Sequence, residues 1–294
     1  MFYRRKVILA LLQVFEDELD KIHFQKLLFL FTRKQVKPEY DFVPYKFGCF
    51  SFSANADIVA MERDELLIET ETIIKKTDET DYLKQLKPAD LKILFEIKAV
   101  YGVMSVNAVM KQTYIEYPYY AINSEVAEKK LSSDELEIVR SVKPAGDKTV
   151  LFTIGYEGIS LEEYLNRLLI NDIKLLVDVR KNALSMKYGF SKSKLLQLCE
   201  SLKIEYIHLP EVGIDSDRRQ ELNGFEDYRK LFEEYKKNNL SRTLGAQLKI
   251  LELLVKKRRI ALTCFEADPD YCHRKHLAEA ISRLKGFNYE VKHI

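Results

Sequence analysis

The sequence is poor in cysteine and lacks any long apolar run. Four cysteines in 294 residues are too few for a disulfide framework, so we expect reduced thiols and a cytoplasmic protein. The apolar stretch 7–14 is too short to span a bilayer, and no small-residue cleavage site follows it. We therefore expect neither export nor contact with a membrane.

Several sequence signatures are also missing. There is no low-complexity tract and no internal repeat, so neither a solenoid nor a disordered tail is needed. A Walker-type phosphate loop, a GxGxxG fingerprint and the zinc signature of deaminases are absent as well. These absences argue against chemistry that uses a nucleoside triphosphate or a dinucleotide, and we expect no cofactor.

The composition is that of a globular protein with more than one domain. Hydrophobic residues make up 47% and charged residues 31% of the chain, and its 294 residues exceed a typical single domain. Pro144 and Gly146 interrupt a helical pattern just before an apolar run. We expect one domain over 1–145 and another over 148–294.

The net charge is only +2, but it is unevenly distributed along the chain. The balance is −3 over 1–147 and +5 over 148–294. The densest basic cluster, 256–259, is either a contact for phosphates or the solvated end of a helix. Charge alone therefore leaves a polyanionic partner open.

The C-terminal half alternates short apolar runs with helical patterns. Runs rich in β-branched residues occupy 150–154, 174–179, 204–209 and 260–265, and a further short run closes the chain. Helical patterns fall between them, at about 160–170, 192–202, 226–236, 242–257 and 273–285. Nearly continuous apolar strands separated by helices predict a mainly parallel, Rossmann-like three-layer α/β sandwich.

Polar residues follow each predicted strand of this half. In open parallel sheets the ligand site lies beyond the carboxyl ends of the strands, so these residues form the candidate site. They are Tyr156 and Glu157, Asp178 and Arg180, His208 and Glu211, and Cys264, Glu266, Cys272, His273 and Arg274. We expect them to line one crevice.

Asp178 and Arg180 end the second predicted strand. The alternation of a strand sends both side chains to one face, with Val179 on the other. A buried structural ion pair and a functional pair both fit this pattern. In the functional interpretation Arg180 holds a phosphate or carboxylate bidentately, and Asp178 orients it or acts as a base.

Cys272, His273 and Arg274 begin a predicted helix, where backbone amides stabilise anions. Three interpretations are open for Cys272: a nucleophile of lowered pKa, a structural or ligand-orienting group, or a zinc ligand. The other zinc ligands would be Cys264, His273 and His276. Because there is no Cys-x2-Cys pair, and His273 and His276 are a helical turn apart, we expect no metal.

The most economical catalytic set is Asp178 and Glu266, supplemented by Glu211. Two carboxylates in different surroundings can divide the roles of acid and base, or one can position water. We expect substrate binding by aromatic, basic, histidine and thiol side chains, namely Tyr156, Arg180, Lys192, His208, Cys272, His273 and Arg274. The combination predicts hydrolysis at a nucleotide, such as removal of a base that is first flipped out of DNA.

Four ordered motifs of the C-terminal half resemble the DUF488 family. They read TIGYEGISLEEYL, LVDVRKNALSMKYGFSKSKL, IEYIHLPEVG and CFEADPDYCHRKHLAEAI, and the resemblance runs from near Thr149 to the C-terminus. It implies the α/β sandwich predicted above and supplies no reaction. Tyr156 and Glu157 stand where the family often has a His-Ser pair, so no role of that histidine is carried over.

The N-terminal half resembles SocA-like, Panacea-type domains related to DUF4065. The residues that carry this resemblance are DKIHFQKLLFLFTRK and YDFVPYKFGCFSFSANADIVAMERDELL. It implies a mostly helical, winged-helix-like module of the kind used in bacterial conflict and toxin-antitoxin systems. The aromatic residues between 42 and 52 either stack on bases or pack beneath a hairpin, and the tyrosine-rich stretch 114–123 is a candidate surface for a protein partner.

Two functions of different classes therefore remain open. The first is a hydrolytic enzyme that acts on nucleic acid, such as a DNA glycosylase for a modified base in bacterial defence. The second is a non-catalytic regulator, whose N-terminal domain binds DNA or a protein and whose α/β domain senses a nucleotide-like ligand. Formation of a product would separate the two.

Overall fold

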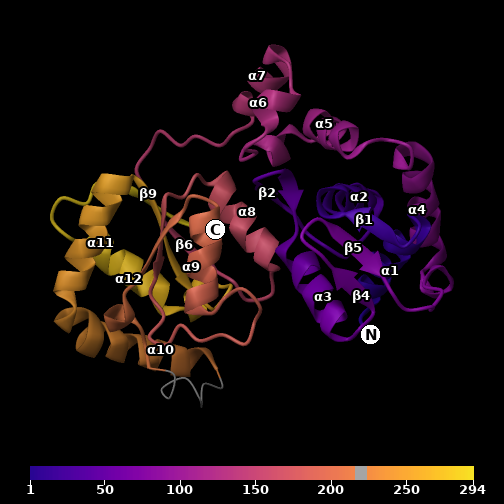
Figure 1. The fold of residues 1–294 in the computed structure, drawn as a ribbon. Helices are drawn as coiled ribbons and strands as arrows, with labels where there is room; N and C mark the ends of the chain where they lie inside the picture. Colours follow the sequence, from indigo (N-terminus) through magenta and orange to yellow (C-terminus); the bar gives the residue numbers. More distant parts are fainter. Residues whose placement is uncertain (216–223) are drawn as a thin grey trace. The chain divides into compact units, whose positions relative to one another are not determined.

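The computed structural model describes residues 1–215 and 224–294. The chain divides into two compact units, Met1–Lys143 and Pro144–Ile294, called here the N-terminal and C-terminal units (Figure 1). The N-terminal unit is mostly helical, and the C-terminal unit is a mixed α/β structure built on a parallel sheet. The fold class predicted from the sequence is therefore confirmed at this level.

The N-terminal unit is built around one helix whose middle part is buried. Its α-helices are α1 (Tyr3–Val14), α2 (Lys21–Lys34), α3 (Phe52–Arg63), α4 (Pro88–Tyr101), α5 (Val106–Glu116), α6 (Ala127–Lys130) and α7 (Ser133–Ser141). Asp20 caps α2 by accepting from the amides of Ile22 and His23. The residues 24–32 of α2 are all buried because other elements cover this part of the helix, although Gln25, Lys26 and Thr32 among them are polar.

Short antiparallel strands complete the N-terminal unit. One sheet has the order β1 (Glu18–Asp20), β5 (Ile73–Lys76), β4 (Leu67–Glu69), and a separate hairpin joins β2 (Val43–Tyr45) to β3 (Gly48–Phe50). Gly48 begins β3 with a φ of +93°, and an added Cβ would lie 2.4 Å from the Tyr114 ring. The hairpin therefore requires glycine at this position.

The C-terminal unit contains a five-stranded sheet in which every described pairing is parallel. The strands are β6 (Val150–Gly155), β7 (Leu175–Asp178), β8 (Glu205–His208), β9 (Arg259–Cys264) and β10 (Glu290–His293), in the order β10-β6-β9-β7-β8. All residues of β6 and β7 are buried, as expected for strands covered on both faces. The parallel sheet predicted from the apolar runs is confirmed.

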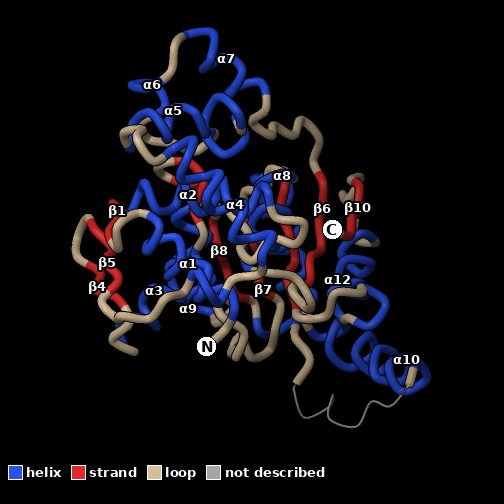
Figure 2. Tube along the Cα trace, turned by 90° about the vertical axis from the view of Figure 1, so that its right-hand side faces the viewer, coloured by secondary structure: helices blue, strands red, loops and turns tan. Residues whose placement is uncertain are grey.

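Helices cover both faces of this sheet (Figure 2). They are α8 (Leu161–Ile170), α9 (Lys192–Ser201), α10 (Phe225–Glu234), α11 (Leu244–Lys257) and α12 (His273–Ser282). The chain moves across the sheet in one direction through α8 and α9 and returns through α10, α11 and α12. Because crossovers between parallel strands are right-handed, the two directions place their helices on opposite faces.

Side chains alternate between these two faces along each central strand. Leu175 and Val177 of β7 lie in one hydrophobic core with Ile260 and Leu262 of β9 and with residues of α11 and α12. The hydroxyl of Tyr164, on α8, donates to Thr263 Oγ1 at 2.8 Å, so Thr263 belongs to the other face. By the same alternation Cys264 faces α12, whereas Asp178 faces α8 and α9.

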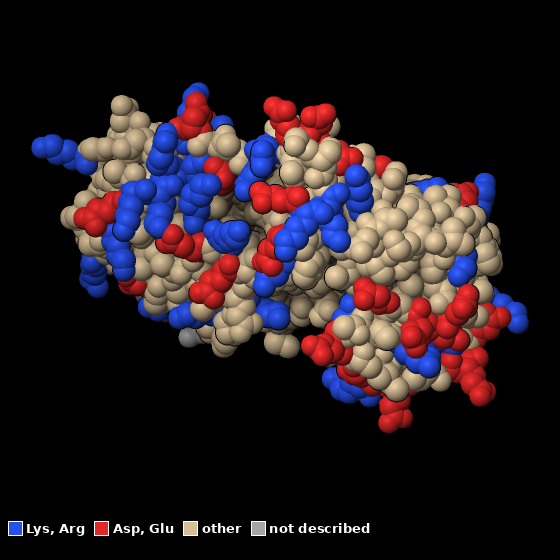
Figure 3. Space-filling model, turned by 45° about the horizontal axis from the view of Figure 1, so that its top comes forward, with Lys and Arg blue, Asp and Glu red and all other residues tan. Residues whose placement is uncertain are grey.

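Charged side chains of both signs lie on the surface of the protein. Figure 3 shows lysine and arginine side chains interspersed with acidic ones on the face that it draws, so the small net charge arises from many charges that cancel. Among the described residues, no single helix combines the length and apolar character needed to cross a membrane. The helices α4 and α5 taken together are long and apolar enough to cross a membrane, by length and composition only, but they are bent by 112° relative to each other.

Candidate functional site

The loops that follow β6 and β9 are bonded to each other at the carboxyl edge of the sheet. The amides of Tyr156 and Glu157 both donate to the carbonyl of Phe265, at 3.0 and 2.9 Å. The Glu157 carboxylate in turn accepts from the Ala267 amide at 3.0 Å. An added Cβ at Gly155 would lie 1.8 Å from the carbonyl oxygen of Glu266, so glycine is needed for the two loops to approach this closely.

Lys187 attaches the loop after β7 to the same edge. Its Nζ donates to the carbonyls of Tyr156 and Ile159, both at 2.5 Å. Desolvation by burial lowers the pKa of Lys187, and the charges of Glu157 and Glu163 act in the opposite direction. Sequence reasoning did not select Lys187, since a lysine inside a long loop gives no sign of where its side chain reaches.

Asp178 and Arg180 form a buried, bidentate ion pair. Arg180 Nε lies 2.9 Å from Asp178 Oδ1 and Nη2 lies 2.5 Å from Oδ2. The carboxylate also accepts from the Arg180 amide at 3.1 Å and from the Tyr206 hydroxyl at 2.7 Å. The exposed fractions are 0% for Asp178 and 5% for Arg180, so both charged groups are satisfied within the protein.

The remaining donors of Arg180 hold an aromatic layer. Arg180 Nη1 donates at 2.8 Å to the Tyr156 hydroxyl and at 2.8 Å to the Phe190 carbonyl. The Tyr156 ring is buried and stacks on Phe190, with 4.2 Å between centroids. Contact of Tyr156 and Arg180 with a substrate stays a prediction, and the structure shows both side chains engaged by neighbouring protein groups.

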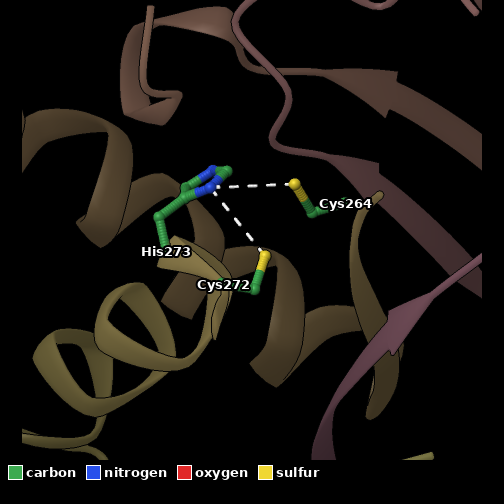
Figure 4. Close-up of side chains that lie close together, drawn as sticks. All are labelled: Cys264, Cys272 and His273. Carbon is green, nitrogen blue, oxygen red and sulfur yellow. Dashed lines mark hydrogen bonds between the residues drawn. The ribbon is translucent and has the colours of Figure 1, made fainter. Parts of the chain in front are cut away.

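Cys264, Cys272 and His273 meet on the other face of the sheet, at the end of β9 and the start of α12 (Figure 4). The sulfur atoms lie 3.7 Å (Cys264) and 3.9 Å (Cys272) from His273 Nδ1. His273 Nε2 lies 3.0 Å from the Val179 carbonyl, which can only accept a hydrogen bond. Nε2 therefore carries the proton of this bond, and Nδ1 is the ring nitrogen that faces the two thiols.

The Cys272 thiol is not activated by its position at the helix start. Burial raises its pKa well above the ordinary value and the neighbouring Cys264 adds to this, while Arg274 acts in the opposite direction. Full burial thus acts against the lowered pKa that a helix start favours, and a nucleophilic role of Cys272 stays a prediction.

Arg274 fixes the turn that follows β9. Its Nη1 and Nη2 donate to the carbonyls of Glu266 and Ala267, at 2.5 and 2.8 Å, and its exposed fraction is 1%. This leaves Glu266 half-buried, with its Oε2 accepting from the Cys264 thiol at 3.2 Å. Arg274 thus positions the loop, and its predicted contact with an anionic group of a substrate stays a prediction.

The other predicted site residues lie in varied surroundings. His208 Nε2 lies 2.8 Å from the Arg180 carbonyl and so belongs to the ion-pair region. Glu211 is exposed in a short 3-10 turn, and Lys192 is exposed at the start of α9. His276 packs against Phe232 with the rings tilted and 4.5 Å between their centroids, and is not part of the Cys264, Cys272 and His273 group.

The family comparison covers this region of the chain. Residues 160–281 match the model of a family described as "Domain of unknown function DUF488". The C-terminal unit contains a DUF488 domain. This DUF488 domain holds every predicted site residue except Tyr156 and Glu157, which precede the match. A search of curated proteins found no match to the chain, and the N-terminal resemblance to SocA-like domains stays a prediction.

Proposed function

We propose that the DUF488 domain is a hydrolytic enzyme that acts on nucleic acid, with Glu266 as the group that activates water. The observation that carries this proposal is the surrounding of Glu266. It is half-buried at the end of the central strand β9, and Phe265 and Tyr271 in the same loop have exposed fractions of 43% and 39%. An accessible carboxylate in a loop that also exposes two aromatic rings suits a substrate that contains a base.

Glu266 is both held in place and accessible, as a general base must be. Arg274 fixes its backbone carbonyl, and the Cys264 thiol donates to its carboxylate. Asp178 is also held in place, by bonds from Arg180 and Tyr206, but it is fully buried and therefore not accessible. We therefore assign water activation to Glu266 and positioning of the loop after β7 to Asp178, while Glu211 remains the candidate for a second accessible carboxylate.

The same edge offers groups that suit a nucleic acid strand. The loop after β7 exposes Leu184, Met186 and Tyr188, and Lys187 bonds this loop to the one after β6. Apolar and aromatic side chains can stack on a base that has left the duplex, and exposed lysines such as Lys192 can neutralise phosphates. These features support DNA as the substrate class.

Base removal is the reaction we favour. Glu266 would take a proton from water, the water oxygen would form the new bond to the sugar C1′, and the C1′–N bond would break. The base would leave with the proton that Glu266 took from water, which restores the carboxylate. A modified base is the most suitable target, because flipping an altered base out of the stack costs less free energy. This chemistry fits a cytoplasmic role in defence, where the four cysteines, all buried and without a disulfide, would stay reduced.

The direct test is an assay on labelled DNA that carries ordinary or modified bases. Wild type should produce abasic sites, and Glu266→Gln should lower the rate by about 10²- to 10⁴-fold because it removes the base. Glu252→Gln, on an exposed position of α11, is the matched control and should retain full activity. Absence of product on every substrate, or equal rates for wild type and Glu266→Gln, would refute the proposal.

A regulator without catalysis is the second candidate, and a cavity in the N-terminal unit favours it. This cavity has a volume of about 360 Å³ and is lined by residues that include Lys26, Tyr45 and Asn55. A winged-helix-like unit that binds DNA or a protein would fit here. In a thermal-shift screen with nucleotides, this candidate requires stabilisation that survives Glu266→Gln and yields no converted ligand.

A further inference from the structure

Three buried metal-binding side chains converge where β9 ends and α12 begins. Cys264 ends the strand, Cys272 is the N-cap of the helix and His273 is its first residue. Their ligand atoms all lie within 4.8 Å of one another. All three side chains are almost completely buried, with exposed fractions of 2%, 0% and 0%.

The spacing of these atoms fits a tetrahedral metal ion. Zinc bonds of about 2.3 Å to sulfur and 2.0–2.1 Å to nitrogen give sulfur-to-nitrogen edges of about 3.5–3.6 Å. The two measured edges, from His273 Nδ1 to the sulfur atoms of Cys264 and Cys272, are 3.7 and 3.9 Å. An ion could therefore be bound with only small movements of these side chains.

His273 is oriented as a metal-bound histidine usually is. Its Nε2 lies 3.0 Å from the Val179 carbonyl, on the neighbouring strand β7. Such a bond from the distal ring nitrogen to a backbone carbonyl fixes the ring and its tautomer, and directs the other nitrogen at the metal. Here that other nitrogen is Nδ1, which faces both sulfur atoms.

The Glu266 carboxylate lies on the accessible side of the cluster, next to the position that the three side chains leave open. Glu266 Oε2 lies 3.2 Å from Cys264 Sγ, and the Glu266 side chain is half-buried. Two thiolates and a neutral imidazole would balance the charge of a divalent ion, which makes the buried site neutral. The soft S₂N donor set selects zinc over magnesium or calcium, which prefer oxygen ligands.

We propose that Cys264, Cys272 and His273 bind one zinc ion, whose fourth position faces the Glu266 side chain and is left for water or a ligand. This replaces the expectation of no metal, which depended on the missing Cys-x2-Cys pair and on His276. The fold removes the need for that pair, because a strand end and a helix start bring the donors together across a turn. The proposal does not depend on hydrolysis, since a zinc ion could serve here without any turnover.

Metal analysis of the full chain tests the site without an activity assay. Protein purified in reductant without chelator should contain about one equivalent of zinc. The metal-free protein should bind Co²⁺ with the visible bands of tetrahedral coordination and the near-ultraviolet charge-transfer band of thiolate ligands. A folded, reduced wild-type protein that takes up neither ion would overturn the proposal.

Single substitutions assign the ligands. Cys264→Ser, Cys272→Ser and His273→Gln should each weaken zinc binding by more than about 100-fold, beyond the cost of losing a supporting partner. Cys199→Ser, at a buried thiol on α9, is the matched control and should bind as wild type does. A ligand variant that retains wild-type affinity would contradict its assignment and the site as proposed.

Two further measurements keep the test decisive. If a ligand variant fails to fold, the Co²⁺ spectrum of wild type and of Cys199→Ser decides alone, because neither alters the proposed ligands. Glu266→Gln separates the two proposals of this site. Loss of base removal with zinc retained would support both, whereas an inactive wild type with bound zinc would refute hydrolysis and leave the metal site standing.

Discussion

Two buried polar groups at the same edge of the sheet differ in how they are satisfied. On one face, the charged pair Asp178 and Arg180 exchanges short, bidentate hydrogen bonds and is completed by Tyr206 and Tyr156. On the other face, Cys264, Cys272 and His273 face one another at 3.7–3.9 Å. Thiols are weak donors, so the second group gains much less from its internal contacts than the first does.

This difference indicates which group serves the fold and which serves a ligand. A buried pair whose bonds are all made by the protein has little capacity left for a substrate, and removing one partner leaves an uncompensated charge. A buried group of thiols and imidazole has strong affinity for soft metals. Its weak internal contacts leave that affinity available for a ligand. We therefore expect substitutions on the first face to change stability, and substitutions on the second to change binding.

The largest expected effect is that of Asp178→Asn. The change removes the charge that compensates Arg180 in a buried place, and should lower the free energy of unfolding by about 3–5 kcal/mol. Urea unfolding of the full chain measures it. Glu163→Gln removes an exposed i,i+4 partner of Arg167 and, as the control, should cost less than about 0.5 kcal/mol. Equal free energies of unfolding for the two variants would contradict the structural role assigned to the Asp178 and Arg180 pair.

Tyr206→Phe should have the next largest effect. Its hydroxyl donates to the Asp178 carboxylate at 2.7 Å, and a bond to a charged group contributes about 1.5–3 kcal/mol. Tyr164→Phe is the matched control, because its hydroxyl bonds a neutral hydroxyl, Thr263 Oγ1, at 2.8 Å. The control should cost about 0.5–1.5 kcal/mol, and a larger loss for Tyr164→Phe in urea unfolding would contradict the ranking.

The sheet and its helices could be read from the sequence, because local patterns determine them. The predicted runs 150–154 and 260–265 became β6 and β9, and the predicted helix 192–202 became α9. Strand alternation likewise places Asp178 and Arg180 on one side, where they form the ion pair. In each of these cases the information lies within a few neighbouring residues.

The contacts within the site could not be read in the same way. The position of Lys187 depends on how a loop of several residues closes, and that of Arg274 on which carbonyls surround the helix start. The group of Cys264, Cys272 and His273 depends on a turn whose path is set by bonds to the loop after β6. Spacing along the chain describes none of these distances, which is why the metal prediction considered His276 and not Glu266.

Lys26 in the N-terminal unit is a third kind of buried polar group, and it sharpens the comparison. Its exposed fraction is 1%, and its Nζ donates to the Cys49 carbonyl at 2.9 Å. Burial lowers the pKa of Lys26, against smaller opposing effects of Cys49. It therefore has neither the strong pairing of Asp178 and Arg180 nor the ligand set of the thiol group.

The pH dependence of stability follows from this lowered pKa. The unfolded chain, with a lysine pKa of about 10.4, binds the proton more tightly than the folded protein does. The contribution of Lys26 to stability is therefore fully present above the pKa of the unfolded chain. It is lost as the pH falls through the lower pKa of the folded protein. Lys26→Met keeps the volume and removes the charge, so it should stabilise the N-terminal unit by about 1 kcal/mol at neutral pH and flatten its pH dependence.

Hydrogen exchange of the α2 amides in the full chain, between pH 6 and pH 10, measures this smallest effect. Lys34→Met alters an exposed lysine of the same helix, paired with Glu96 at 2.9 Å, and should leave the pH dependence as it is in wild type. Destabilisation by Lys26→Met with an unchanged pH dependence would show that the ammonium contributes favourably. The buried lysine would then contribute to stability, as the pair of Asp178 and Arg180 does. A buried charge that lacks a counter-ion would then not be a criterion for telling a ligand site from a structural group.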